Sequence, residues 1–144
     1  MKKLLITILI GFGVYGYIEK NPGVIPSFSE ETDTSSQALT AAYEKRQSDE
    51  QVSGSGRVIR LLPDDNEGSR HQKFIIRVSS GRTLLIAHNI DLAPRINSIR
   101  EGDTIEYFGE YEWNSKGGVI HWTHNDPNGR HEDGWLKHKG RIYQ

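Results

Sequence analysis

Cysteine is absent from this chain of 144 residues, so neither disulfides nor thiolate metal ligands can support the fold or a site. An excess of charge of one sign is also missing, because the formal net charge is -1 at pH 7. This balance argues against broad affinity for nucleic acid or for an anionic membrane surface. The length suits one domain, which its hydrophobic core must hold together unaided.

Long hydrophobic runs are missing from most of the chain and occur at the N-terminus, where residues 4–18 follow Lys2 and Lys3. A basic start followed by a short apolar stretch indicates a signal peptide, or a signal anchor that stays uncleaved in the inner membrane. We therefore expect the remainder of the protein to be periplasmic or secreted.

Residues 19–52 are polar and poor in large apolar side chains, which predicts a flexible linker. Within this linker, residues 36–47 have helical spacing, and Ser35 or Ser36 can cap the start of a helix. We expect a short spacer helix that leans on the domain rather than a helix that binds a partner.

Residues 53–144 switch to the alternating pattern of short β-strands. The predicted strands are 57–62, 73–78, 83–88, 104–113 and 119–123, followed by a short edge strand at 141–143. A short helix is predicted at 91–100, with Asp91 as its cap. Three strands, a helix and two strands is the order of an OB-type barrel. The fold class is therefore mainly β, a small OB-like five-stranded barrel with one short helix; another small barrel or a sandwich is the alternative.

Four stretches of this domain resemble a known family: HQKF at 71–74, AHNIDLAPR at 87–95, GEYEWN at 109–114 and GGVIHWTHNDP at 117–127. They resemble the bacterial family catalogued as domain of unknown function 3465, over nearly all of residues 53–144. The resemblance implies an exported bacterial protein and brings no established activity with it.

The end of the fifth predicted strand concentrates reactive side chains. His121, His124 and Asp126 offer two imidazoles and a carboxylate within a few positions. Such a set can bind a divalent metal, with zinc, calcium and magnesium as candidates, and leave positions open for water. The same groups can act as acid and base without a metal, or they can simply bond the loop backbone. His88 and His131 are expected to approach from other parts of the chain.

The loop between the first two strands carries Arg70 and His71, together with Asp64 and Asp65. In OB barrels this loop and the loop between strands four and five lie over the binding face. The fold would therefore bring His71 close to the fifth strand. The alternative is an ordinary solvated turn.

Residues 88–95 also carry a faint resemblance to thermonuclease-like OB barrels. That resemblance implies that Asp91 holds a cation and that Arg130 stabilises phosphate charge. The position after Pro94 is Arg95, where a glutamate is expected, so a histidine would have to act as the base. The alternative makes Asp91 a helix cap and Arg95 a solvated residue.

Tryptophans provide the last candidates. Trp113 and Trp122 are either core anchors or, if exposed, a stacking platform for sugars or bases. With Asn89 and Arg70 they form the predicted ligand-binding set.

Two functions from different classes follow. The first is a hydrolase of phosphodiesters with its site at the barrel mouth. Its predicted catalytic residues are His71, His88, His121, His124 and Arg130, and its predicted metal ligands are His121, His124, Asp126 and Asp91. The second is a non-catalytic OB module that binds an oligosaccharide, nucleic acid or protein partner in the cell envelope.

Overall fold

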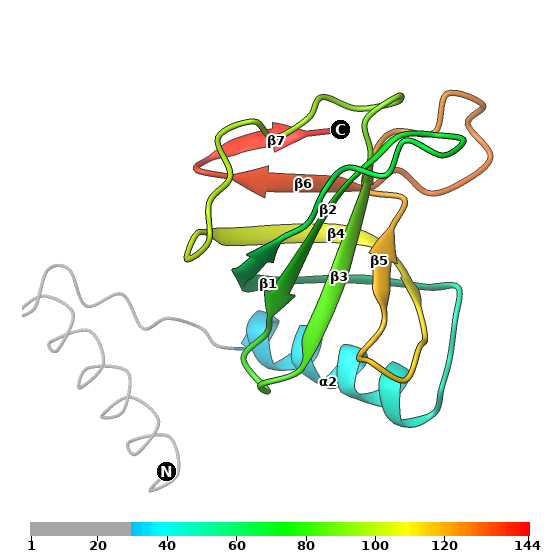
Figure 1. Ribbon diagram of the computed structural model, residues 1–144. Coiled ribbons are helices and arrows are strands. Elements are labelled where there is room, and N and C mark those ends of the chain that lie inside the picture. Colours follow the sequence, from blue (N-terminus) through cyan, green and yellow to red (C-terminus); the bar gives the residue numbers. More distant parts are fainter. Residues whose placement is uncertain (1–29) are drawn as a thin grey trace, which may run out of the picture. The chain divides into compact units, whose positions relative to one another are not determined.

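The computed structural model describes residues 30–144, which form one helix and seven strands (Figure 1). The signal or anchor predicted at residues 1–18 lies outside the described residues, as do linker residues 19–29. The division of the chain at residues 18 and 52 stays a prediction. Within the described part, no helix is long and apolar enough to cross a membrane.

The elements follow in this order: α2 (Glu30–Glu44), β1 (Glu50–Leu61), β2 (His71–Arg77), β3 (Thr83–Asn89), β4 (Thr104–Glu112), β5 (Val119–His121), β6 (Trp135–His138) and β7 (Arg141–Tyr143). The five predicted strands and the edge strand at 141–143 are confirmed. β1 begins earlier than predicted, and β6 was not predicted. The mainly β fold class is therefore confirmed.

Five strands close into the predicted barrel. Neighbouring strands pair in the order β1-β2-β3-β5-β4, and β4 returns to β1 along the whole stretch from Glu50↔Tyr111 to Arg57↔Thr104. β3 and β5 run parallel, and the other pairs are antiparallel. β6 and β7 extend the sheet from β4. Closure pairs the strand edges that an open sheet would expose to other chains.

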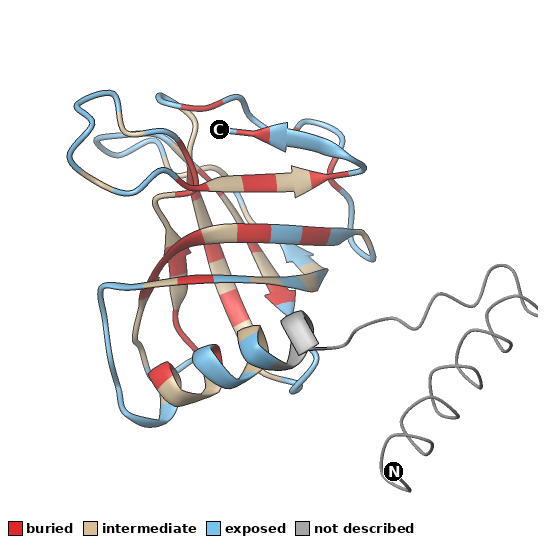
Figure 2. Cartoon of the chain, turned by 180° about the vertical axis from the view of Figure 1, so that it is seen from behind, coloured by how far each residue is buried: buried red, intermediate tan, exposed pale blue. Residues whose placement is uncertain are grey.

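The hydrophobic core lies inside the barrel. Along β4, buried Ile105, Tyr107 and Tyr111 alternate with side chains on the outer face, as a strand requires. Figure 2 shows buried and exposed positions alternating along the strands. The helix adds Leu39 and Ala42 to the same core. Burying a leucine side chain stabilises a fold by about 1.5–3 kcal/mol, so α2 contributes to the stability of the barrel.

α2 starts at Glu30 rather than at the predicted position 36, so neither Ser35 nor Ser36 is its N-cap. It packs beside the β2–β3 turn, where the hydroxyls of Ser36 and Ser79 lie 3.1 Å apart. The Arg82 guanidinium stacks over the ring of Tyr43 at 4.1 Å from its centre. The predicted helix is therefore confirmed with shifted bounds, and it packs directly on the barrel.

The helix predicted at 91–100 is wrong, because these residues form turns and irregular backbone. The Ile96 N–H donates to the side-chain oxygen of Gln72, and the Gln72 amide donates back to the Ile96 carbonyl. An α-helix would need that same N–H to bond the carbonyl of Leu92. Leu92, which helical spacing placed on the buried face, is 44% exposed.

Candidate functional site

The folded chain separates its histidines instead of gathering them. His88 is fully buried near the end of β3, and both His71 and His124 lie close enough to affect its pKa. His121 and His131 instead face Glu110 on the outer side of β4. His88 and His71 were predicted to approach His121 and His124; they lie near His124, whereas His121 belongs to a different group with His131.

His88 has both ring nitrogens occupied. Its Nε2 donates to the Pro94 carbonyl at 3.0 Å, so its Nδ1 accepts from the Thr123 hydroxyl at 2.7 Å. Burial lowers the pKa of His88 to about 4, an effect that the Pro94 carbonyl opposes and that His124 and His71 reinforce. His88 is thus a neutral imidazole that ties β3 to two loops, with no nitrogen left for a metal.

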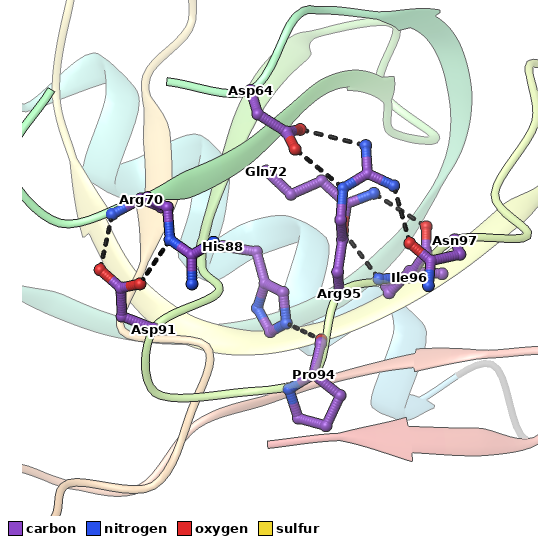
Figure 3. A network of polar contacts seen from close by, with 9 residues as sticks. All are labelled: Asp64, Arg70, Gln72, His88, Asp91, Pro94, Arg95, Ile96 and Asn97. Carbon is purple, nitrogen blue, oxygen red and sulfur yellow. Dashed lines mark hydrogen bonds and ion pairs between the residues drawn. The ribbon is translucent and has the colours of Figure 1, made fainter. Parts of the chain in front are cut away.

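The charged residues around the mouth of the barrel neutralise one another (Figure 3). Asp91 accepts hydrogen bonds from the Arg70 backbone and guanidinium at 2.9 and 2.7 Å. Arg95 donates to both carboxylate oxygens of Asp64 at 2.9 and 3.1 Å. The side chain of Asn89 accepts from the Asp91 N–H. We call Asp64, Arg70, Asn89, Asp91, Arg95 and His88 the mouth network.

The backbone N–H of Arg70 and its guanidinium both donate to Asp91, and they hold the pKa of that carboxyl below its usual range. The carboxylate that was predicted to hold a cation is therefore already paired. Likewise, Arg95 pairs with Asp64, an acidic residue of the loop between the first two strands. These contacts fix the irregular segment between β3 and β4 against the β1–β2 loop.

The loops before β2 and before β5 lie at opposite ends of β3, so the prediction that they meet is wrong. The Thr83 hydroxyl, at the start of β3, donates to the Lys116 carbonyl of the β4–β5 loop. At the other end of β3, Asn89 is paired with His71, which also bridges to Asp65. The loop that reaches the mouth is instead the one after β5, through His124.

Residues 122–134 form a compact loop that leaves and rejoins the same edge of β4. His121 pairs with Glu110 at one end, and Trp135 pairs with Phe108 at the other. The Asp126 carboxylate accepts hydrogen bonds from the backbone N–H groups of the loop: Asn128, Arg130 and His131. These bonds lower the pKa of Asp126. Asp126, a predicted metal ligand, thus serves as an internal cap for this loop.

The base of this loop is closely packed. A Cβ on Gly134 would lie 1.9 Å from the Trp122 carbonyl oxygen and 2.6 Å from that of Phe108. Trp122 adopts φ 55°, a left-handed conformation that side chains rarely accept. Its ring stacks on His131 with centres 3.9 Å apart and planes at 9°. The surrounding loop holds Trp122 in this strained conformation, and stacking on its ring positions His131 over β4.

Beneath the loop, the outer face of the sheet carries a second polar group. The ligand atoms of Glu110, Glu112 and His121 all lie within 4.8 Å of one another. His121 Nε2 is 3.5 Å from a Glu110 oxygen and 3.4 Å from a Glu112 oxygen. With His131 and Gln51, we call these residues the outer-face cluster.

Three neighbouring strands build this cluster through their register. Gln51 of β1 is opposite Glu110 of β4, which is opposite His121 of β5. Opposite residues in antiparallel strands project to the same side of a sheet with Cβ atoms about 5 Å apart. The amide nitrogen of Gln51 and Nε2 of His121 are both buried without a hydrogen-bond partner among the described residues. Native proteins rarely leave such atoms unpaired, so this row has room for an additional partner.

His131 is the member of the cluster whose pKa is raised. Its Nδ1 donates to the Glu132 carbonyl at 2.7 Å, and its Nε2 donates to Glu110 at 3.0 Å. Burial alone would lower the pKa of His131, but these two hydrogen bonds and the charges of Glu110 and Asp126 raise it above 6.5. With two acceptors facing its nitrogens, the site favours the protonated form of His131.

A family model described as a protein of unknown function, DUF3465, matches residues 23–144. The chain belongs to this family. A search of curated proteins found no match to the chain. The DUF3465 match covers α2, the whole barrel, the mouth network and the outer-face cluster.

The remaining predicted site residues are dispersed. The His124 ring donates from Nδ1 to the Asn125 carbonyl, and His71 does the same to Ser69. Trp113 packs against the core and lies under Arg46. Arg130 is exposed and forms no ion pair among residues 30–144. The predicted metal set of His121, His124, Asp126 and Asp91 does not come together, because only His121 reaches the outer-face cluster.

Sequence reasoning missed Glu110, Glu112 and Gln51. In the sequence, Glu110 and Glu112 alternate with apolar residues of the fourth strand, and nothing distinguishes them from Glu106 on the same face. Their pairing with His121 depends on the register between β4 and β5, which strand patterns do not determine.

Proposed function

We propose that this DUF3465 domain is a metal-dependent hydrolase of phosphodiesters, with its metal at Glu110, Glu112 and His121. One observation carries the proposal: three ligand atoms converge within 4.8 Å, and the imidazole nitrogen among them is buried without a hydrogen-bond partner. A cation would satisfy that nitrogen and offset two carboxylate charges at once.

The donor set favours zinc over the other candidate metals. Calcium and magnesium prefer shells made of oxygen, whereas zinc accepts imidazole and carboxylate together. Catalytic zinc sites have three protein ligands and keep a further position for water. The hydrogen bond from His131 to Glu110 would orient one of these ligands, as outer partners do in zinc enzymes.

Such a metal would supply a water with a pKa near ~7 and a positive charge beside the phosphoryl oxygens. Held by Glu110, Glu112 and His121, the metal would supply this nucleophile, and one P–O bond would form as another breaks. His131 would release its Glu110 hydrogen bond to protonate the departing oxygen, and the proton of the water would pass to solvent. Arg130, the neighbour of His131 in the exposed loop, is free to bind phosphate charge.

Metal binding is tested by calorimetric titration of the metal-stripped protein with zinc. We expect one site per chain, with at least about tenfold weaker affinity after Glu112→Gln or His121→Ala, which corresponds to a loss of about 1.4 kcal/mol. Glu106→Gln is the matched control, because Glu106 lies on the same face of β4 but outside the cluster. Equal affinity in Glu112→Gln and Glu106→Gln would refute this metal site.

Hydrolysis is tested separately with bis-p-nitrophenyl phosphate, plasmid DNA and RNA. We expect cleavage by the zinc-loaded protein, its loss in EDTA, and at least about tenfold slower cleavage after His131→Gln. If zinc binds normally and none of these substrates is cleaved, the hydrolase proposal fails and the metal site remains.

The non-catalytic binding module is the second candidate, and the mouth network favours it. Asp64, Asp91 and His88 are each paired, so the mouth offers a rigid surface rather than reactive groups. For either function, we propose that the domain works in the periplasm or outside the cell, because residues 1–18 have the pattern of a signal or anchor. Cell fractionation that finds the protein in the cytoplasm would contradict this location.

A further inference from the structure

A separate hollow lies where α2 and the β2–β3 turn meet β1, β4 and β6. Its volume is about 490 Å³, within the usual range of small-molecule sites. Ser55 of β1 is opposite Glu106 of β4, and both line the hollow. Glu106 precedes Glu110 by four strand positions, roughly 13 Å, so the hollow is distinct from the outer-face cluster.

Hydroxyl groups dominate the wall of this hollow. Six small hydroxyl residues line it: Ser35, Ser36, Ser53, Ser55, Ser79 and Thr104. Leu39, Val78 and the half-buried Trp135 provide its apolar surface. A hydroxyl both donates and accepts hydrogen bonds, so the lining matches a ligand that carries many hydroxyls of its own.

The Ser-Gly-Ser-Gly run at 53–56 explains how the hollow forms. A Cβ on Gly54 would lie 2.6 Å from the Tyr107 hydroxyl, and a Cβ on Gly56 would lie 2.9 Å from Ile76. Because they lack a Cβ, the glycines leave room for core side chains on the inner face. The small serine side chains between them leave open space on the other face. Glycine within a strand is less favourable than alanine, so the run weakens β1 locally.

The charge of the lining limits which ligands the hollow can bind. Among the described residues that line the hollow, Glu106 is the charged one, and its carboxylate faces Lys137 at 3.8 Å. An anionic ligand would meet this carboxylate without a cation in the lining to offset it. A neutral polyol would instead donate hydroxyls to it, with Trp135 as a flat apolar wall.

We propose that this hollow binds a neutral saccharide, held by the serine and threonine hydroxyls, Glu106 and Trp135. This site is independent of metal binding at the outer-face cluster. It gives the domain a carbohydrate subsite on the same side of β4 as the proposed metal.

The test uses the full chain, with maltotriose and triacetylchitotriose as neutral probes and a heparin disaccharide as the anionic one. Saturation-transfer NMR and tryptophan fluorescence would measure binding. We expect saturable binding of a neutral probe with a dissociation constant at or below about 1 mM. Ser55→Leu fills the hollow from an exposed position and should weaken binding at least about tenfold.

Ser98→Leu is the control, since Ser98 is exposed and does not line the hollow. If Ser55→Leu unfolds at lower temperature than the control, Ser53→Leu replaces it. The proposal is overturned if neither neutral probe saturates the protein at about ten times the 1 mM limit on the dissociation constant. It is also overturned if filling the hollow leaves the affinity unchanged. Tighter binding of the heparin disaccharide than of both neutral probes would overturn it as well.

Discussion

The mouth network and the outer-face cluster use the same kinds of side chain in opposite ways. At the mouth, His88 bonds on both ring nitrogens, and Asp64 and Asp91 each bind an arginine. On the outer face, the buried nitrogens of His121 and Gln51 lack a hydrogen-bond partner among the described residues, although the carboxylates of Glu110 and Glu112 lie 3.5 and 3.4 Å from His121 Nε2. Both regions contain imidazoles and carboxylates, so composition alone does not distinguish them.

The difference shows how a site can be separated from a scaffold. A polar group whose partners are complete holds loops in place, and breaking it costs stability. A buried group with a missing partner costs stability as it stands, so it marks a place where a ligand, an ion or a water can bind. The following predictions test whether the two regions differ in this way.

Replacing His88 should cause the largest loss of stability. His88→Ala leaves a cavity and strips the Pro94 carbonyl and Thr123 hydroxyl of their partner. We expect the free energy of unfolding to fall by about 4 kcal/mol, against less than about 1 kcal/mol for His121→Ala, whose side chain is one-third exposed (33%). Urea denaturation followed by tryptophan fluorescence measures both. Similar losses in the two variants would remove the distinction between scaffold and site.

Acid should weaken the fold through the same residue. The pKa of His88 is lowered to about 4 in the folded protein, against 6.5 when unfolded. Between these values the unfolded chain binds a proton that the folded His88 does not, so stability falls as the pH drops from 6.5 toward 4. The contribution is on the order of 3 kcal/mol. Urea midpoints at several pH values measure this slope, and an unchanged slope in His88→Gln would assign it to other groups.

The base of the 122–134 loop should respond strongly to one methyl group. Gly134→Ala forces the Trp122 and Phe108 carbonyls apart, and we expect a loss of about 2 kcal/mol together with weaker zinc binding. Gly129→Ala is the matched control, because φ is 63° there but no atom lies within 4 Å. Strain alone should cost about 1 kcal/mol at that position. Thermal unfolding that ranks the control as the more damaging change would contradict this account of the loop.

The smallest expected effect on stability concerns His131. Its folded pKa lies above 6.5, so its contribution is complete below pH 6.5 and is lost as the pH rises through the folded value. We expect less than about 1 kcal/mol from this pair. Nitrogen-15 NMR titration should give a pKa of His131 above 6.5, and Glu110→Gln should lower that pKa. Glu106→Gln should leave it unchanged, and a wild-type value at or below 6.5 would remove the proposed proton donor.

Strand patterns predicted much of the fold because they record burial directly. The alternation of Ile105, Tyr107 and Tyr111 with polar residues marks a strand with one buried face, whatever its neighbours are. The helix predicted at 91–100 failed because Gln72, far away in the sequence, takes the hydrogen bonds of Ile96. β6 was not predicted, although its four residues, Trp135–His138, alternate between buried and half-buried positions.

The candidate site was predicted less completely than the fold. His121 and His124 lie close together in the sequence and looked like one constellation, yet one is on the outer face and the other is buried near His88. Asp126 looked like a ligand, but the turn of its own loop uses its oxygens. Side-chain direction at the end of a strand depends on the path of the following loop, which the pattern of residues does not encode.

The sequence by itself determined a small β-domain, its closed five-stranded order, the absence of cysteine chemistry and its membership of DUF3465. These properties follow from local burial patterns and from motifs, which are read along the chain. Only the tertiary structure decided that Gln51, Glu110 and His121 form one row and that Asp91 and Asp64 are already neutralised. The reason is physical, because strand register and barrel closure choose which distant side chains meet, and a shift of one residue would turn each of them to the opposite face.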